Sequence, residues 1–362
     1  MHGLGAARGV ALGVMMLAAG GCAAAPEGAP QPASGAQESS ADRFRKTVER
    51  SALRERAISE LLGLAVSADA QSRANALEAL LPATARLRGP VAAGLSDENE
   101  GVRAVAAVVA GRAKLRESEP ALRALASDSS PFVRASALFA LRNMGAEVDL
   151  TPLGAMLLEH PVSGVRAHAA FLIGELGDES AMPMLRQALH TRPSSSTAEE
   201  DRLVGLQIAE AMVKLGDRER LEGIRAALYP SHPGEMELAT LAVQILGRLN
   251  DRASVAQLIS LSEYRQGDRG MPGELRLAVA DAVSRMGRRE AWFIAEEYLK
   301  DPDPLRRALS AHVLGKTGRV EDLEILERLL GDPSPAVRLA AAGSVLTATA
   351  DSPGRVEASV EP

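Results

Sequence analysis

A short turn motif recurs along the chain at a nearly constant interval, and this recurrence limits the possible folds more than any other feature. In each copy an aspartate is followed six residues later by an arginine, as in Asp332 and Arg338. The same step occurs from Asp97 to Arg103, from Asp128 to Arg134 and from Asp301 to Arg307. Aligned on the arginine, the units fall at Arg73, Arg103, Arg134, Arg166, Gly205, Ala239, Arg276, Arg307 and Arg338. The steps of 30 to 39 residues predict about nine helical hairpins stacked as a repeat array.

Each unit has the pattern of two short amphipathic helices joined by the motif turn. In the last unit Leu323, Leu326 and Leu330 are spaced to line one face of the first helix. The apolar positions of the second helix are Val337, Leu339, Ala341, Val345 and Leu346. Between the helices, we expect the Ser334 side chain to cap the second helix and Pro335 to occupy its first turn. Because aromatic residues make up 2% of the chain, the core must be built from Ala, Leu and Val.

This pattern resembles HEAT-like repeats, including the short form found in phycobilisome-lyase-type repeats. The resemblance covers roughly residues 50 to 349. It implies an all-α fold, a right-handed α-solenoid of about nine HEAT-like hairpins, in which the second helices line the concave face. It implies no particular function, because the same repeats serve scaffolds, adaptors and a few enzymes.

The repeated acid and arginine predict a structural ladder between neighbouring units. An Asp at the turn and an Arg one turn into the next helix can pair from unit to unit, and exposed pairs of this kind contribute about 0 to 1 kcal/mol each. We therefore expect the ladder to set the register of the units rather than to supply bulk stability. The predicted ladder residues are Asp97, Arg103, Asp128, Arg134, Arg166, Arg276, Asp301, Arg307, Asp332 and Arg338.

Three successive motif turns are longer than the others. They span residues 190–201, 229–235 and 264–274, and we call them together the expanded edge. Equivalent turns of a solenoid stack along one side, and insertions on one face often mark a binding surface. The predicted partner-binding residues are Arg192, Tyr229, His232, Tyr264, Arg265, Asp268 and Arg269. The alternative is that these turns are tolerated surface insertions whose tyrosines lie against their own helices.

The N-terminal segment differs in composition from the repeats. Residues 1–21 combine Arg8, a short apolar run and small residues, as in an export signal. The small residues before Cys22 resemble the lipobox of bacterial lipoproteins, although Ala19 stands where that family prefers Leu. The resemblance implies lipidation of Cys22; the alternative is a plain secretory signal. Residues 22–42 have the composition of a disordered tether, residues 43–349 form the predicted solenoid, and residues 350–362 are a disordered tail.

Sequence motifs for catalysis are absent. The six histidines are scattered, with no helical pair that would present two nitrogens to one metal. The sequence also lacks a nucleophile elbow, a P-loop and a dinucleotide fingerprint. A formal charge of -6 without a long basic run gives no support to nucleic-acid binding. We therefore predict no catalytic residues, no metal and no cofactor.

The leading hypothesis is a lipid-anchored, extracytoplasmic scaffold that binds an unknown protein or peptide through the solenoid groove and the expanded edge. In a bacterium with two membranes, the residue after Cys22, Ala23, resembles that of lipoproteins sent to the outer membrane, facing the periplasm. Two alternatives remain: a HEAT-like lyase or tetrapyrrole-binding protein, and a structural spacer of the cell envelope without a specific partner.

Overall fold

Paired helices follow one another along the chain, as the repeat predicts. The computed structural model describes residues 40–193, 196–230, 235–266, 269–288 and 291–350. The outer helices are α2 (Ser40–Leu64), α4 (Arg88–Gly94), α6 (Glu119–Leu125), α8 (Thr151–Glu159), α10 (Met182–His190), α12 (Arg220–Ala226), α14 (Val255–Glu263), α16 (Trp292–Tyr298) and α18 (Val320–Leu329). The inner helices are α3 (Ala70–Ala79), α5 (Glu100–Arg112), α7 (Pro131–Asn143), α9 (Ser163–Leu176), α11 (Ala198–Lys214), α13 (Met236–Arg248), α15 (Gly273–Arg285), α17 (Pro304–Thr317) and α19 (Pro335–Ala348).

A few short elements complete the description. The 3-10 segments are η1 (Leu81–Arg86), η2 (Arg116–Ser118), η3 (Glu179–Ala181) and η5 (Arg252–Ser254). In the third expanded turn, β1 (Arg265–Gln266) and β2 (Arg269–Gly270) pair as a minimal antiparallel hairpin. The fold is an all-α solenoid, and α2 begins at Ser40, inside the segment that the sequence assigns to the tether. Within the described ranges no helix has the length and apolar character needed to span a bilayer.

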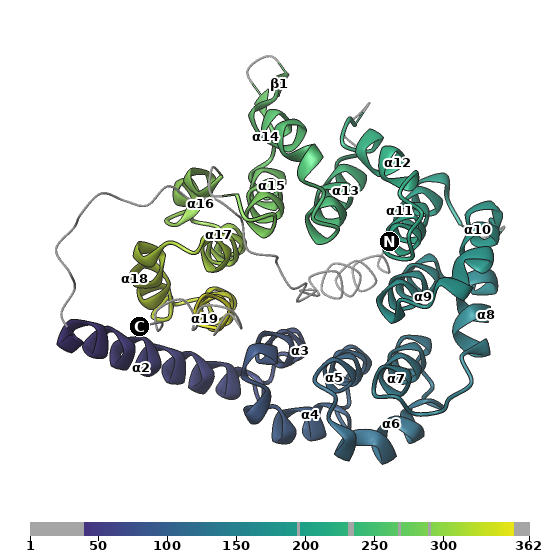
Figure 1. Ribbon diagram of the computed structural model, residues 1–362, viewed down its shortest axis with the longest axis horizontal. Helices are drawn as coiled ribbons and strands as arrows, with labels where there is room; N and C mark the ends of the chain where they lie inside the picture. Colours follow the sequence, from purple (N-terminus) through teal and green to yellow (C-terminus); the bar gives the residue numbers. More distant parts are fainter. Residues whose placement is uncertain (1–39, 194–195, 231–234, 267–268, 289–290, 351–362) are drawn as a thin grey trace, which may run out of the picture.

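The solenoid closes into a ring, which the sequence does not predict. Figure 1 shows the inner helices arranged around a centre, with α19 beside α2 and α3. The last inner helix therefore packs against the first unit as well as against α17. At this seam the Arg54 guanidinium donates hydrogen bonds to the carbonyl oxygens of Leu346 (3.1 Å) and Pro82 (2.8 Å). The groove expected on the concave side is thus the inside of a closed ring.

Inner helices approach one another closely where glycine removes a side chain. A Cβ atom added to Gly111 would lie 2.6 Å from the Cα atom of Ala140 on the next inner helix. At Gly174 the corresponding distance, to Ala211, is 2.8 Å. Any larger residue would collide with backbone, so these glycines set the spacing of neighbouring units.

The turn that starts the last inner helix, α19, is capped differently from the sequence prediction. Pro131 and Pro335 do occupy the first turn of α7 and α19. However, the side chain of Ser334 makes no cap hydrogen bond. Instead, the Asp332 carboxylate accepts a hydrogen bond from the Ser334 backbone N–H at 2.8 Å. The capping prediction was therefore wrong for Ser334, whereas Asp303 caps α17 by accepting a hydrogen bond from the Leu305 N–H at 2.9 Å.

Candidate functional site

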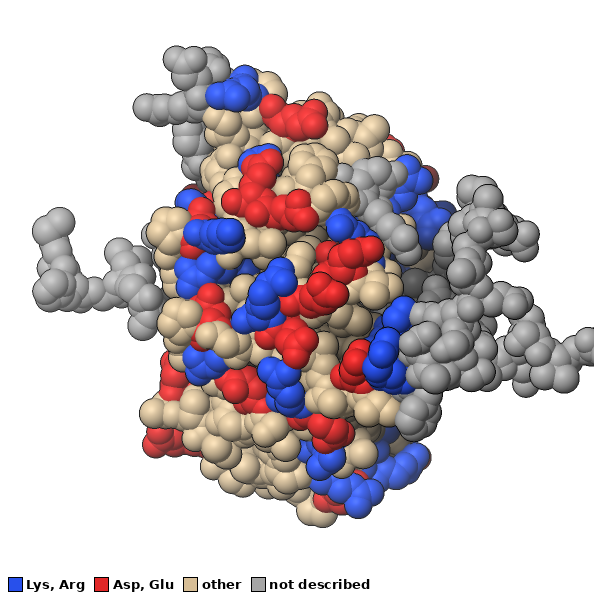
Figure 2. All heavy atoms as spheres, turned by 90° about the vertical axis from the view of Figure 1, so that its left-hand side faces the viewer, with Lys and Arg blue, Asp and Glu red and all other residues tan. Residues whose placement is uncertain are grey.

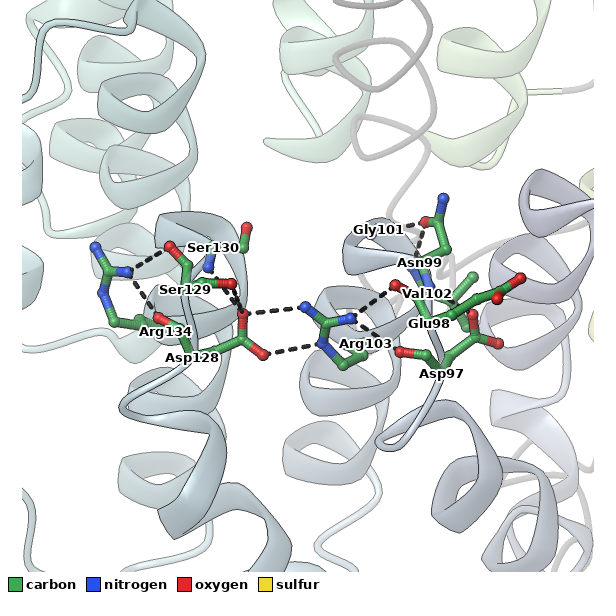
Figure 3. A network of polar contacts seen from close by, with 10 residues as sticks. All are labelled: Asp97, Glu98, Asn99, Gly101, Val102, Arg103, Asp128, Ser129, Ser130 and Arg134. Carbon is green, nitrogen blue, oxygen red and sulfur yellow. Dashed lines mark hydrogen bonds and ion pairs between the residues drawn. The ribbon is translucent and has the colours of Figure 1, made fainter.

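The arginine of each motif joins two units at once. In the second unit the Arg103 guanidinium donates to both carboxylate oxygens of Asp128 in the next unit, at 2.9 and 3.1 Å (Figure 3). Its Nη1 atom also donates to the carbonyl oxygens of Asp97 (2.9 Å) and Glu98 (3.0 Å) in its own turn. The side chains of Arg103 and Asp128 are 17% and 10% exposed, so this pair is far less solvated than a free surface pair. The arginine therefore closes its own turn and fixes the position of the next one.

The same contact recurs elsewhere in the ring. Arg73 binds Asp97 at 2.8 Å through two nitrogens, and Arg307 binds Asp332 at 2.9 and 3.0 Å. Hydrogen bonds from Arg73 hold the pKa of Asp97 below its ordinary value. Hydrogen bonds from Arg307 do the same for the pKa of Asp332. The charged form of each carboxyl group is thus favoured in the folded ring.

Other ladder arginines use different acids of the next unit. Arg166 lies 3.4 Å from Asp201 on α11. Arg276 pairs with Glu297 on α16 and also donates to the Tyr298 hydroxyl at 2.9 Å.

Two ladder predictions are only partly realised. Arg134 donates to the carbonyl oxygens of Asp128 and Ser129 in its own turn, and the next unit carries His160 in place of the acid. The Asp301 carboxylate accepts from the Asp303 N–H at 2.8 Å rather than from a ladder arginine of the preceding unit.

The ladder passes through the seam of the ring. Arg338, in the last unit, donates from Nε to the Glu60 carboxylate of the first outer helix at 2.8 Å. Its Nη1 atom binds the carbonyl oxygens of its own turn, Asp332 and Pro333, as the other ladder arginines do. Arg338 therefore joins the last unit to the first unit, as the other ladder arginines join consecutive units.

The expanded edge lies on the arc of the ring away from the seam, after α10, α12 and α14 (Figure 1). Tyr229 and Tyr264 are 62% and 55% exposed, so more than half of the surface of each is open to solvent. Arg192 and Arg265 are also exposed. An ion pair between Arg202 on α11, the helix that follows the first expanded turn, and Glu235 holds the end of the second expanded turn. The expanded edge therefore carries an exposed tyrosine at each of two consecutive expanded turns.

Some predicted site residues cannot be placed with the others. Cys22, His232 and Asp268 lie outside the described residues. Arg269 belongs to β2, but its side chain is outside the description as well.

A buried ionic network on the inner helices was not found from the sequence. Glu210 on α11, 1% exposed, accepts from Arg248 on α13 at 2.8 and 2.7 Å and from Lys214 at 2.8 Å. Lys214 also reaches Glu175 on α9 at 2.7 Å, and Glu175 pairs with Arg112 on α5 at 2.6 Å. The network, formed by Arg112, Glu175, Glu210, Lys214 and Arg248, ties four inner helices together.

Electrostatics determine the protonation state of this network. Burial alone raises the pKa of Glu210, but the charges of Arg248 and Lys214 outweigh burial and leave its pKa below the ordinary value. Glu175 behaves in the same way, with Lys214 as its main cation. The sequence does contain a signal for this network. In four units a charged residue follows nine positions after the position aligned with the ladder arginine, namely Arg112, Glu175, Lys214 and Arg248.

One buried pair has the residue types of a nucleophile and a base. The Ser136 hydroxyl on α7 lies 3.0 Å from His168 Nε2 on α9. Burial lowers the pKa of His168 to about 4, so its imidazole is neutral at pH 7. Ser136 is fully buried, and among the described residues no group hydrogen-bonds to His168 Nδ1 to orient the ring. The pair therefore has the features of a hydrogen bond between units rather than of a catalytic dyad.

Comparison with protein families agrees with this architecture. A family model for HEAT repeats matches residues 87–167 and 268–347, and a model for the PBS lyase HEAT-like repeat matches residues 165–191. The chain is a HEAT-like repeat protein. A search of curated proteins finds no match to this HEAT-like repeat protein.

A search of solved structures returns matches of low identity and low TM-score. Human deoxyhypusine hydroxylase in complex with glycerol is 15% identical, with 84% of this HEAT-like repeat protein and 97% of the hydroxylase covered and a TM-score of 0.33. An engineered protein is 17% identical, with 83% and 95% covered and a TM-score of 0.32. A second engineered protein is 16% identical, with 74% and 96% covered and a TM-score of 0.23. Such low scores support no inference about activity. Over the described part of the HEAT-like repeat protein, no group of three or more potential metal ligands comes together.

Proposed function

We propose that this HEAT-like repeat protein is a scaffold, tethered outside the cytoplasm by a lipid on Cys22, that binds a protein or peptide through the expanded edge. The observation that carries the proposal is the exposure of Tyr229 and Tyr264 at consecutive expanded turns. Tyrosine is enriched at interfaces because it combines a large apolar ring with a polar tip and has few rotatable bonds.

The ring supports this role by holding the edge in place. Each expanded turn leads into an inner helix that packs on both of its neighbours, so the turns keep a constant spacing. The ion pair between Arg202 on α11 and Glu235 restricts the second expanded turn further. A surface held in this way loses less entropy when a partner binds. Binding a protein or peptide through such a surface requires no catalytic group.

Site-specific photocrosslinking tests the proposal. A photoreactive phenylalanine analogue at position 229 or 264 should crosslink one discrete protein in cells that produce the chain. Position 162 is the matched control, because Val162 is 51% exposed but lies at a turn of ordinary length. A crosslinked species that forms equally at all three positions, or at none, would contradict binding through the expanded edge.

The tether is tested separately. Metabolic labelling with a radioactive fatty acid should mark the wild-type chain and leave Cys22→Ser unlabelled. A wild-type chain that takes up no label would refute the lipid anchor without affecting the edge.

A further inference from the structure

Half of the first helix lies beyond the ring. From Leu53 onward α2 packs into the seam, where Leu53, Ala57 and Leu61 are buried. The residues from 45 to 52 are all exposed, and Figure 1 shows this half of α2 extending past α18 and α19. The projecting half is thus an ordered helix that no described part of the ring covers.

The projecting half is positively charged in a negatively charged protein. Residues 45–52 contain Arg45, Lys46 and Arg50 against one acid, Glu49, whereas the whole chain has a formal charge of -6. Figure 2 shows positive and negative side chains interspersed over the neighbouring face of the ring, so a local excess of one sign is unusual there.

The basic residues continue a face of α2 that already binds acceptors. Lys46, Arg50 and Arg54 are spaced by four residues and therefore share one side of the helix. Arg54 uses this side to bind the Leu346 carbonyl and, at 3.0 Å, the Thr349 hydroxyl at the end of α19. Arg50 and Lys46 lie about one and two turns farther out on the same side of the helix.

We propose that the projecting half of α2 contacts the anionic headgroups of the membrane to which the chain is tethered. This inference rests on the proposed lipid anchor, because residues 23–39 are the only chain between Cys22 and α2. A chain of 17 residues reaches at most about 60 Å, which limits how far α2 can lie from the bilayer surface. Each cation near an anionic surface raises membrane affinity about 5-fold, and a lipid anchor is commonly supported by such a second signal.

The orientation that results has a functional consequence. With α2 against the headgroups, the arc that carries α10 to α13 lies on the far side of the ring (Figure 1). Most of the expanded edge is then held away from the membrane, where a soluble partner can reach it.

Vesicle flotation of the unlipidated protein tests the contact. The protein is the chain from residue 22 with Cys22→Ser, which keeps every described residue. We expect it to bind vesicles of 70% phosphatidylcholine and 30% phosphatidylglycerol, to bind vesicles of phosphatidylcholine alone much less, and to dissociate at high salt. The double variant Lys46→Gln/Arg50→Gln should lose binding about 25-fold, since two cations are removed.

The matched control is Arg218→Gln/Arg252→Gln, which removes two exposed cations on the arc away from the seam. It should bind as the parent protein does. Equal loss in both double variants, or no preference of the parent for anionic vesicles, would overturn the proposal. Binding that appears only after residues 351–362 are removed would also overturn it, because the acidic tail would then be the native occupant of the basic face.

This experiment is independent of the anchor. Vesicle binding with no fatty-acid labelling of the wild type would refute the anchor alone, and labelling without vesicle binding would refute the contact alone. Circular dichroism of each variant confirms that the helices are retained.

Discussion

Removal of the charge at Glu210 should destabilise the ring strongly, although the substitution changes almost no volume. In Glu210→Gln the Arg248 side chain, 5% exposed, loses the carboxylate that accepts two of its hydrogen bonds. Lys214, 16% exposed, loses one of its two acids. Removing one partner of a buried ion pair costs about 3 to 5 kcal/mol, because the remaining charge stays in a poorly solvated position. Since the amide oxygen can still accept one hydrogen bond, we expect about 3 kcal/mol, the lower end of that range.

Thermal unfolding followed by circular dichroism measures this effect. For a folded region of about 300 residues, 3 kcal/mol corresponds to a decrease of about 6 °C in the unfolding midpoint. Glu222→Gln is the matched control, because Glu222 is 77% exposed and its pair with Arg225 is solvated. That change should move the midpoint by about 1 °C or less. If both variants unfold at the same temperature as wild type, the network does not stabilise the ring.

Three further predictions concern spacing and pH. Gly111→Ala should lower the unfolding midpoint, because the added Cβ atom would meet the Ala140 backbone. Gly223→Ala should raise the midpoint slightly, because nothing lies within 4 Å of a Cβ atom there. Equal shifts in the two variants would contradict the close approach of α5 and α7 at Gly111. Arg103→Met should cost more stability at pH 7 than at pH 3. Burial raises the pKa of Asp128, but the hydrogen bond from Arg103 outweighs it and holds that pKa below 3.8, so the stabilisation by the pair is present at pH 7 and declines as the pH falls below 3.8. Wild-type stability should fall as the pH drops below the ordinary aspartate pKa of 3.8. The pKa of Asp97 is lowered in the folded ring, so the unfolded chain binds a proton at this residue at a higher pH than the folded chain does. An unfolding midpoint that does not change between pH 5 and 3 would contradict this.

The local architecture could be predicted because each unit repeats its own turn chemistry. A proline at the first helical position, an aspartate two residues before the cap and glycines at helix ends act within a few residues, so the sequence alone predicts the helical hairpins. The partner of Arg103 could also be anticipated, because it lies one unit away at the equivalent turn.

Closure of the ring and the buried ionic network depend on packing between units, which the sequence of one unit does not specify. The curvature of a solenoid is the sum of small rotations between neighbours, and the seam pair Arg338 and Glu60 is separated by 278 residues. Lys214 and Arg248 each resemble an ordinary cation at a helix C-terminus, where such residues are common. Their burial follows only from the packing of adjacent inner helices around Glu210. The exposure of Tyr229 and Tyr264, likewise, could be proposed but not decided from sequence.

Disulfide trapping across the seam tests the closed ring most directly. A Cβ atom at Gly343 would lie 3.1 Å from the Cβ atom of Ala79, close to the separation of a disulfide-bonded pair. In a Cys22→Ser background, Ala79→Cys with Gly343→Cys should oxidise within one chain and migrate as a compact monomer until reduced. The single variants Ala79→Cys and Gly343→Cys are the references, because a chain with one cysteine cannot form a disulfide within itself. If the double variant stays reduced or links only separate chains, as the single variants can, the units form an open solenoid and the ring is wrong.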